Sequence, residues 1–205
     1  MPDTRRQILD SARSCLLDVG YANLSTRRIA EAAGLALGHL HYHFGSKRNL
    51  ILAVLADENE RLLDRQGRMY AEDLPIWKQW EQACDYLDAD LHSGYVRVLQ
   101  EMTAAGWSDP EVAAAVRVLL QGWFDLLAVV AERAEHEIGS LGPFTWAETA
   151  ALVGDVFLGA ETMLLLGVGD AEVPHRTALR KVATWIRLVE EGHARRGGDD
   201  ARLHT

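Results

Sequence analysis

Apolar residues recur at helical spacing along the whole chain, and this periodicity limits the possible folds more than any other feature of the sequence. Four of the five prolines, at positions 75, 110, 143 and 174, separate the helical segments and interrupt none of them. The 205 residues contain no alternating run bounded by hairpin turns and no internal repeat. The sequence therefore predicts an all-α fold.

The composition excludes several classes of protein. Hydrophobic residues make up 48% of the chain and charged residues 25%, which is typical of a globular protein and excludes a disordered one. Two cysteines, Cys15 and Cys84, are too few for a disulfide scaffold or a four-thiolate zinc site. The N-terminus lacks the apolar core of a secretory signal, and the most apolar stretch, 150–169, carries Asp155 and Glu161. We therefore expect a cytoplasmic protein with no membrane partner.

Charge is distributed unevenly along the chain. The formal net charge is −9, yet residues 1–50 carry seven Lys or Arg against four acids, which gives +3. Residues 51–205 carry 14 basic and 26 acidic residues, which gives −12. A basic N-terminal part followed by an acidic remainder indicates that one region meets a polyanion and the other does not. We place the domain boundary between residues 50 and 51.

Start and stop signals predict three short helices in the basic part. Thr4 and Gln7 have the spacing of a capping box for the first helix, and Ser25 has the position of an N-cap for the second. Gly34 ends the second helix, and a third covers about 37–43. A long fourth helix follows, and further amphipathic helices are predicted at about 76–92, 95–105, 110–138, 146–166 and 174–194.

Residues 24–47 carry the clearest functional signal. A short helix, a tight turn at Gly34 and a second short helix are typical of the helix-turn-helix motif, whose second helix enters the major groove of DNA. Leu40 and Phe44 are four residues apart and are predicted to anchor that second helix inward. Side chains able to hydrogen-bond bases or phosphates occupy its other positions: His39, His41, Tyr42 and His43. Helix N-termini, which favour phosphate, carry Ser25, Arg27, Arg28 and Lys47.

The same segment resembles the DNA-binding domain of the TetR family of bacterial repressors. The resemblance is carried by Ile29-Ala30, Ala33-Gly34, Gly38, Leu40, Tyr42, Phe44, Ser46-Lys47 and Leu50, together with Gly20-Tyr21. It implies a three-helix DNA-binding domain at 1–50, followed at 51–205 by a six-helix domain with a ligand pocket and a dimer interface. By matching position it implies DNA contacts from Ser25, Arg27, Gly38, His39, His41, Tyr42, His43 and Lys47.

Two positions depart from the family pattern. His41 stands where the family usually has a tyrosine, and Leu37 stands where a polar residue is usual. Leucine cannot donate a hydrogen bond to a base edge, but it can contact the methyl group of thymine. Double-stranded DNA is therefore the expected partner, while the operator sequence is not predicted.

A metal site is an alternative interpretation of the three histidines at positions 39, 41 and 43. In a helix His39 and His43 share a face, and His41 does not. Two imidazoles with no nearby thiolate or carboxylate make a poor closed site, so we expect no metal. Gly167 and Gly169 lack the third glycine and the preceding strand of a dinucleotide fingerprint, so we expect no cofactor.

Large aromatic residues are spread over the long helices of the second domain. Trp80, Trp107, Trp123 and Phe157 are predicted to line a cavity for a small hydrophobic effector, because pockets have mostly apolar walls with few polar groups. The alternative is that these residues are ordinary core. Glu101, Gln121 and Glu161 interrupt apolar surroundings, and the sequence does not distinguish ligand contacts from solvent-facing positions for these three.

The last two long helices are predicted to form a homodimer interface. In the first, Val156, Gly159 and Met163 recur at helical spacing, and the glycines at 154 and 159 allow another helix to come close. In the second, Leu179, Val182 and Ile186 form a further apolar stripe. Two copies of this helix pair related by a two-fold axis would form a four-helix bundle.

These observations together predict a ligand-responsive transcriptional repressor. It would bind a palindromic operator as a dimer and be released by a small, largely apolar effector. Two alternatives are a helical dimer without DNA binding and an all-α enzyme that uses Glu101 or Glu161 as a base. The enzyme interpretation lacks a clustered nucleophile and base and leaves the basic N-terminus unexplained, so we expect no catalysis.

Overall fold

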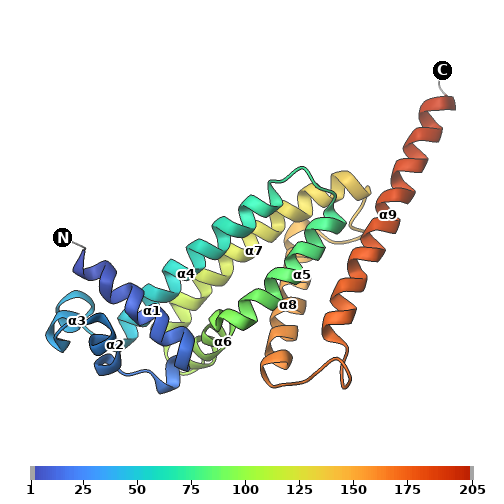
Figure 1. The fold of residues 1–205 in the computed structure, drawn as a ribbon. Coiled ribbons are helices and arrows are strands. Elements are labelled where there is room, and N and C mark those ends of the chain that lie inside the picture. The colour runs from blue at the N-terminus through green and yellow to red at the C-terminus, as the bar shows by residue number, and fades with distance from the viewer. Residues whose placement is uncertain (1–2, 204–205) are drawn as a thin grey trace. The chain divides into compact units, whose positions relative to one another are not determined.

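A computed structural model describes residues 3–203 of the protein (Figure 1). Within that range the chain forms nine α-helices and no strand, which confirms the all-α prediction. In chain order the helices are α1 (Thr4–Asn23), α2 (Thr26–Ala33), α3 (Leu37–Phe44), α4 (Lys47–Tyr70), α5 (Ile76–Ser93), α6 (Tyr95–Gly106), α7 (Pro110–Ile138), α8 (Trp146–Leu165) and α9 (His175–Leu203). Each predicted segment corresponds to one of these helices.

The chain divides into two compact units. Unit 1 comprises residues 1–62 and 90–120, and unit 2 comprises residues 63–89 and 121–205. The long helices α4, α5 and α7 each contribute residues to both units. The predicted boundary between residues 50 and 51 divides the chain by expected function and not by packing, so it stays a prediction.

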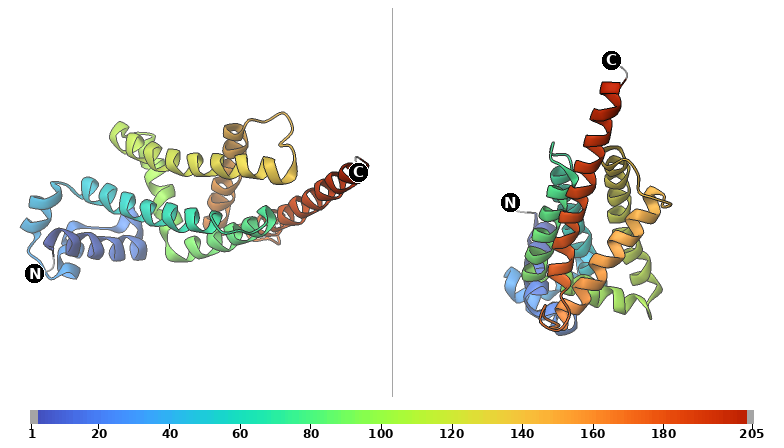
Figure 2. Two further views of the ribbon diagram at one scale, coloured as in Figure 1. Left: turned by 90° about the horizontal axis from the view of Figure 1, so that it is seen from above. Right: turned by 90° about the vertical axis from the view of Figure 1, so that its right-hand side faces the viewer.

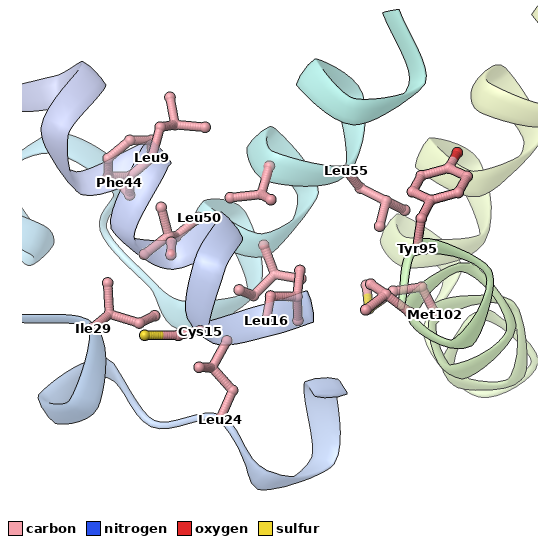
Figure 3. Close-up of a cluster of buried hydrophobic side chains, with 14 of the residues drawn as sticks. Leu9, Cys15, Leu16, Leu24, Ile29, Phe44, Leu50, Leu55, Tyr95 and Met102 are labelled. Atoms are coloured by element: carbon pink, nitrogen blue, oxygen red, sulfur yellow. The ribbon is translucent and has the colours of Figure 1, made fainter. Parts of the chain in front are cut away.

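Unit 1 is built around a continuous apolar core. α1, α2 and α3 pack around one another, and α4, α6 and the first half of α7 complete the core (Figure 2). Ile8, Ile29 and Ile51 are fully buried in it. Figure 3 shows the same cluster, in which side chains from α1, α2, α3, α4 and α6 point toward one another.

The start of α1 differs from the predicted capping box. Asp3 is the N-cap, and its carboxylate accepts a hydrogen bond of 3.0 Å from the Arg5 backbone N–H. Gln7 does not return to the cap: its side-chain amide donates to the Ala33 carbonyl at 2.8 Å. This hydrogen bond satisfies a carbonyl at the C-terminal end of α2. Gln7 therefore connects two helices of unit 1, a role that its local spacing does not reveal.

The end of α1 is bent at Gly20 and held by α6. Gly20 has a φ of +77°, and a Cβ there would lie 2.6 Å from a carboxylate oxygen of Glu101. That carboxylate accepts a hydrogen bond from the Tyr21 backbone N–H, directly after the bend. Before the bend, Arg97 donates to the carbonyls of Leu17 at 2.6 Å and Asp18 at 3.3 Å. Two side chains of α6 thus satisfy backbone groups on both sides of the bend.

Unit 2 has a smaller filled core. α8 and α9 run antiparallel, and the α8 backbone comes close to α7, because a Cβ at Gly154 would lie 2.2 Å from the Phe124 ring (Figures 1 and 2). The rings of Trp80 and Phe157 lie 5.5 Å apart. Ile76, Ala134 and Ile186 are buried members of the cluster to which Trp80 belongs. Among the described residues, fewer large side chains are completely enclosed here than in unit 1.

α7 has the length and apolarity of a helix that could cross a membrane. Some of its apolar side chains pack within the protein: Val112 and Val116 lie in the core of unit 1, and Leu127, Ala131 and Ala134 are buried in unit 2, whereas Val118 and Val129 are exposed. It begins at Pro110 after the N-cap Asp109, whose carboxylate accepts from the backbone N–H groups of Glu111 and Val112. α7 thus contributes to the cores of both units and also exposes part of its apolar surface.

Candidate functional sites

The turn between α2 and α3 follows from local sequence signals. The Ser25 hydroxyl accepts a hydrogen bond of 3.2 Å from the Arg28 backbone N–H, which confirms Ser25 as the N-cap of α2. Gly34 ends α2 in the left-handed conformation, with a φ of +65°, which glycine adopts at little cost. Leu40 and Phe44 are buried, so they anchor α3 inward as predicted.

The outward side of α3 carries the polar residues predicted to contact DNA. Gly38, His39 and His41 are exposed, and Tyr42 is 85% exposed. His43 is half-buried and its ring packs edge-on against the Tyr42 ring, with 5.1 Å between centroids. A phenol held at this exposure on a short helix, above two buried anchors, is available for contacts with another molecule.

The hydrogen bond of His41 fixes the proton on its ring. Nδ1 lies 3.2 Å from the Gly45 carbonyl oxygen, which can only accept, so Nδ1 carries the hydrogen. In the neutral ring Nε2 is then an acceptor, which suits the exocyclic amino groups of adenine or cytosine. This pairing also occupies one nitrogen of the three-histidine pattern. Within residues 3–203 no group of three or more potential ligands is arranged to hold a metal ion.

Acidic residues pair with most of the basic side chains of unit 1. Arg28 lies 3.0 Å from Asp18, and Arg48 pairs with Asp109 at 2.7 Å and with Glu111. The hydrogen bond from Arg48 is the main reason that the pKa of the Asp109 carboxyl is lowered. These pairs reduce the number of cations that remain for a polyanion.

Arg27 and Lys47 are both predicted to contact phosphate, but their surroundings differ. Arg27 pairs with Glu31 one turn along α2 at 3.2 Å, and both side chains are highly exposed, so the pair contributes little and can be exchanged for a phosphate. The Lys47 ammonium donates to the Tyr21 carbonyl at 2.9 Å and lies 4.6 Å from the centroid of the Tyr21 ring. Burial lowers the pKa of Lys47. No carboxylate within the described residues forms an ion pair with Lys47.

Unit 2 contains a cavity of about 200 Å³. Its walls come from the end of α4 and from α5, α7, α8 and α9. The lining is mainly aliphatic and aromatic, with Tyr70, Gln79 and Thr149 as its polar members apart from the tryptophan N–H groups. Large, mostly apolar cavities with few polar groups are the usual form of small-molecule sites.

The cavity includes two of the four aromatic residues predicted to line it. Trp80 and Phe157 are in its wall. Trp123 lies outside the lining and its indole N–H donates to the Gln66 side chain at 3.0 Å. Trp107 follows the last residue of α6 in unit 1 and is 83% exposed, so it fills no core and lines no cavity there. Trp185 belongs to the wall and was not among the predicted residues.

The three acidic or amide residues singled out from the sequence also lie outside the cavity lining. Glu101 belongs to unit 1, where it accepts from Tyr21. Gln121 donates to Asp125 on the same exposed face of α7, at 2.8 Å. Glu161 is absent from the lining as well. An interruption in an apolar segment therefore did not identify the ligand-facing positions.

The predicted dimer residues differ between the two helices. On α8, Val156 is 53% exposed, Gly159 is exposed with no atom near its added Cβ, and Met163 is exposed as well. On α9, Leu179 and Ile186 are buried within their own chain, and Val182 lines the cavity. The α9 half of the interface prediction therefore requires correction, because periodicity identifies an apolar stripe without identifying what the stripe faces.

α9 carries a second apolar stripe on its outer side. The stripe consists of Trp185, which is 62% exposed, and Leu188, which is 58% exposed; at the same spacing before them stand the charged Lys181 and the small Ala178. The exposed stripe of α8 has the same spacing and consists of Leu152, Val156, Gly159, Met163 and Leu166. Exposed apolar patches of this kind mark interaction surfaces.

Comparison with known proteins identifies the family that the N-terminal segment matches. Residues 8–54 match the family model of the bacterial regulatory proteins, tetR family. This segment is a TetR-family domain. The HTH-type transcriptional repressor AcnR of Corynebacterium glutamicum is 37% identical over 62 residues, which are 30% of this chain and 33% of the relative. The match thus spans about a third of the length of such curated relatives.

Solved structures extend the likeness beyond the TetR-family domain. A TetR transcription regulator from Haloarcula marismortui has a TM-score of 0.72 at 19% identity, over 91% of this chain and 97% of that one. The regulator FadR from Bacillus subtilis, solved with stearoyl-CoA, has a TM-score of 0.70 at 13% identity, over 88% and 96%. At these identities the likeness concerns the fold, an N-terminal helix-turn-helix followed by a helical domain.

The TetR-family domain contains all eight residues predicted to contact DNA, on α2, α3 and the first turn of α4 or at their N-termini. Six of them are exposed, whereas His43 and Lys47 are half-buried, and Lys47 lies beside the Tyr21 ring. The two cysteines are buried, and burial raises the pKa of the Cys84 thiol to about 11. A thiol with so high a pKa is a poor redox sensor at neutral pH.

Proposed function

We propose that this protein is a ligand-responsive transcriptional regulator that binds an operator as a homodimer and is released by a small, largely apolar effector. The observation that carries the proposal is the TetR-family helix-turn-helix, in which Leu40 and Phe44 are buried while Tyr42 and two histidines of α3 are exposed. A short helix with this division of residues fits the recognition helix of a DNA-binding motif.

Sequence readout is assigned to α3 and phosphate contact to the helix N-termini. His39, His41 and Tyr42 supply hydrogen-bonding groups for base edges or phosphates. Ser25 and Arg27 lie at the N-terminus of α2, where backbone N–H groups and the helix dipole favour phosphate. Leu37 is available for a thymine methyl group. Because the net charge is −9, binding depends on this local surface and not on the charge of the whole protein.

Dimerisation is assigned to the outer stripes of α8 and α9. Val156, Trp185 and Leu188 would otherwise leave large apolar surfaces in water. Two such helix pairs related by a two-fold axis form a four-helix bundle, which is self-complementary as a closed dimer requires. The same axis would bring two recognition helices to half-sites about 34–36 Å apart.

The cavity of unit 2 is assigned to the effector. α4, α5 and α7 contribute residues to both units, so a change in the packing of the cavity wall has continuous helices along which to act. An effector shifts the equilibrium only by its difference in affinity between the DNA-binding and released conformations. Such a regulator works in the cytoplasm and catalyses no reaction, in keeping with the regulators to which the chain is similar.

A gel shift with the DNA upstream of the protein's own gene tests the proposal. We expect a retarded complex with the specific fragment at protein concentrations that leave a scrambled fragment free. Tyr42→Ala is expected to remove most of this preference, because it deletes a proposed contact of the recognition helix. The variant should still fold, because Tyr42 is exposed. Equal affinity for both fragments would favour the helical dimer without operator binding.

The salt dependence of the same complex tests the phosphate contacts. Lys47→Gln keeps a donor for the Tyr21 carbonyl and removes the charge, so the slope of log K against log salt is expected to fall by about 1 for any DNA sequence. Lys78→Gln is the matched control, since Lys78 lies in unit 2 beside Trp77. An unchanged slope in Lys47→Gln would remove Lys47 from the set of phosphate contacts.

A further inference from the structure

The size of the cavity limits what it can hold. An apolar cavity of about 150 Å³ is sufficient to bind benzene. The cavity of unit 2 has about 200 Å³, which leaves room for one aromatic ring with substituents or for two fused rings. Trp80, Phe157 and Trp185 supply aromatic surfaces for such a ring. A long acyl chain exceeds this volume.

The polar groups of Gln79 are already engaged in the protein. Its side-chain amide donates to the carbonyls of Tyr70 at 3.4 Å and Glu72 at 3.0 Å, and its oxygen accepts from the Arg133 guanidinium. The indole N–H of Trp80 donates to the Leu179 carbonyl at 2.7 Å. Both donors of Gln79 and the donor of Trp80 are therefore used within the protein, and the Gln79 oxygen already accepts from a cation.

The wall also presents no unbalanced charge. The described lining contains no Asp, Glu, Lys, Arg or His. A cation that contacts wall residues, Arg133, donates to the Tyr70 carbonyl and to Gln79 and forms an ion pair with Glu137 at 3.4 Å. Burial raises the pKa of the Tyr70 phenol, which keeps this wall residue neutral. A charged ligand would lose its hydration without finding an opposite charge.

Thr149 differs from Gln79 and Trp80 in its hydrogen bonding. Its hydroxyl oxygen is buried and has no hydrogen-bond partner among the described residues. It lies in the first turns of α8, where the backbone is held by the capping box of Thr145 and Glu148. A buried hydroxyl without a partner carries a desolvation cost that a ligand group can remove.

We propose that the effector is an uncharged aromatic compound of one or two rings with one hydrogen-bonding group, which it places against the hydroxyl of Thr149. The inference rests on the proposed function only in giving the ligand a regulatory role. The chemistry of the cavity is measured on the purified protein without DNA, so the two proposals fail separately.

Calorimetric titration with four matched probes tests the ligand class. Toluene, p-cresol, p-toluate and 4-methylbenzylammonium share one ring and differ in a single group. We expect p-cresol to bind about three- to tenfold more tightly than toluene, and the two ions to bind at least tenfold more weakly than p-cresol. Binding of either ion as tight as that of p-cresol, or no binding of any probe, overturns the proposal.

Two threonine variants test the contact. Thr149→Val keeps the shape of the side chain and removes the hydroxyl, so p-cresol should lose its advantage while the affinity for toluene is unchanged. Thr162→Val is the control on the same helix, because the Thr162 hydroxyl donates to the Leu158 carbonyl at 2.9 Å and lies outside the wall. A full advantage of p-cresol in Thr149→Val assigns the contact elsewhere and overturns the proposal. Circular dichroism checks that both variants are folded.

A gel shift then separates this inference from the proposed function. Release of the operator complex by p-cresol and not by p-toluate supports both proposals. Selective binding of p-cresol to a protein that does not retard DNA keeps the ligand class and removes the regulator. Specific DNA binding together with the wrong ranking of probes keeps the regulator and removes the ligand class.

Discussion

The two units use the same secondary structure in different ways. In unit 1 short and long helices enclose a filled core in which Ile8, Ile29 and Ile51 are inaccessible to solvent. In unit 2 long helices enclose a cavity and carry apolar stripes on their outer sides. A filled core specifies one arrangement, whereas a cavity and exposed stripes require further molecules to complete the packing. The difference suits a recognition element of fixed shape and a region that responds to ligands.

The largest expected effect compares the two faces of α9. Ile186→Glu places a charge in the cavity wall and is expected to cost more than about 4 kcal/mol, which unfolds the protein or nearly so. Leu188→Glu changes an exposed residue, so the fold should persist. Sedimentation should then show a monomer, and a gel shift should show weakened binding to the operator. Urea denaturation and sedimentation velocity on the two variants make the measurement. A dimeric Leu188→Glu would place the interface on another surface.

Core truncations compare the packing of the two units directly. Ile51→Ala is expected to lower the free energy of unfolding by about 3–4 kcal/mol, because the filled core of unit 1 cannot collapse around the new space. Ile76→Ala enlarges a cavity that is already present and is expected to cost closer to about 2 kcal/mol. Urea midpoints at one protein concentration provide the test. Equal losses would mean that unit 2 is as tightly packed as unit 1.

Two glycines of α8 separate packing inside the chain from packing between chains. A Cβ at Gly154 meets the Phe124 ring at 2.2 Å, so Gly154→Ala is expected to destabilise the protein by about 1–2 kcal/mol. A Cβ at Gly159 meets nothing within 4 Å, so Gly159→Ala is expected to add up to about 1 kcal/mol of helix propensity. The same substitution should weaken dimerisation if Gly159 lies where the helices approach. Thermal unfolding and a dilution series measure the two effects.

The smallest expected effect is a difference in pH dependence. Burial of Asp57 alone would raise its pKa, but hydrogen bonds from Arg61 and Arg6 lower it, so its contribution to stability is present above the unfolded pKa and is lost as the pH falls. Burial raises the pKa of Glu190, so its contribution has the opposite sign and is lost as the pH rises. Asp57→Asn should lower the urea midpoint at pH 7 more than at pH 3. Glu190→Gln should raise the midpoint at pH 7 and change it least at pH 3.

Local signals in the sequence predicted the helices well, for identifiable reasons. Ser25, Gly34 and the prolines act on their immediate neighbours, so their effects follow from residue type and spacing. The capping box at Thr4 was the exception, because Gln7 finds a partner in α2 instead. Long-range partners of this kind depend on how helices meet, which no local pattern contains.

The sites were predicted less evenly than the helices. In α3 the two inward anchors are four residues apart and exposed residues lie between them, so Leu40 and Tyr42 could be assigned from spacing alone. The cavity wall combines residues from five helices, and neither Thr149 nor Trp185 has a local signal for it. Trp107 was predicted to line the cavity and instead faces solvent after the end of α6, because large size does not by itself require burial.

Trp185 belongs to two surfaces, since it lines the cavity and is also part of the outer stripe of α9. If that stripe meets a second copy of the chain, occupation of the cavity and association of the subunits become linked equilibria, and each must change the other by the same factor. Apparent ligand affinity would then depend on protein concentration. Dilution alone would alter the response, so the cellular abundance of the protein would help to set the ligand concentration at which it leaves DNA.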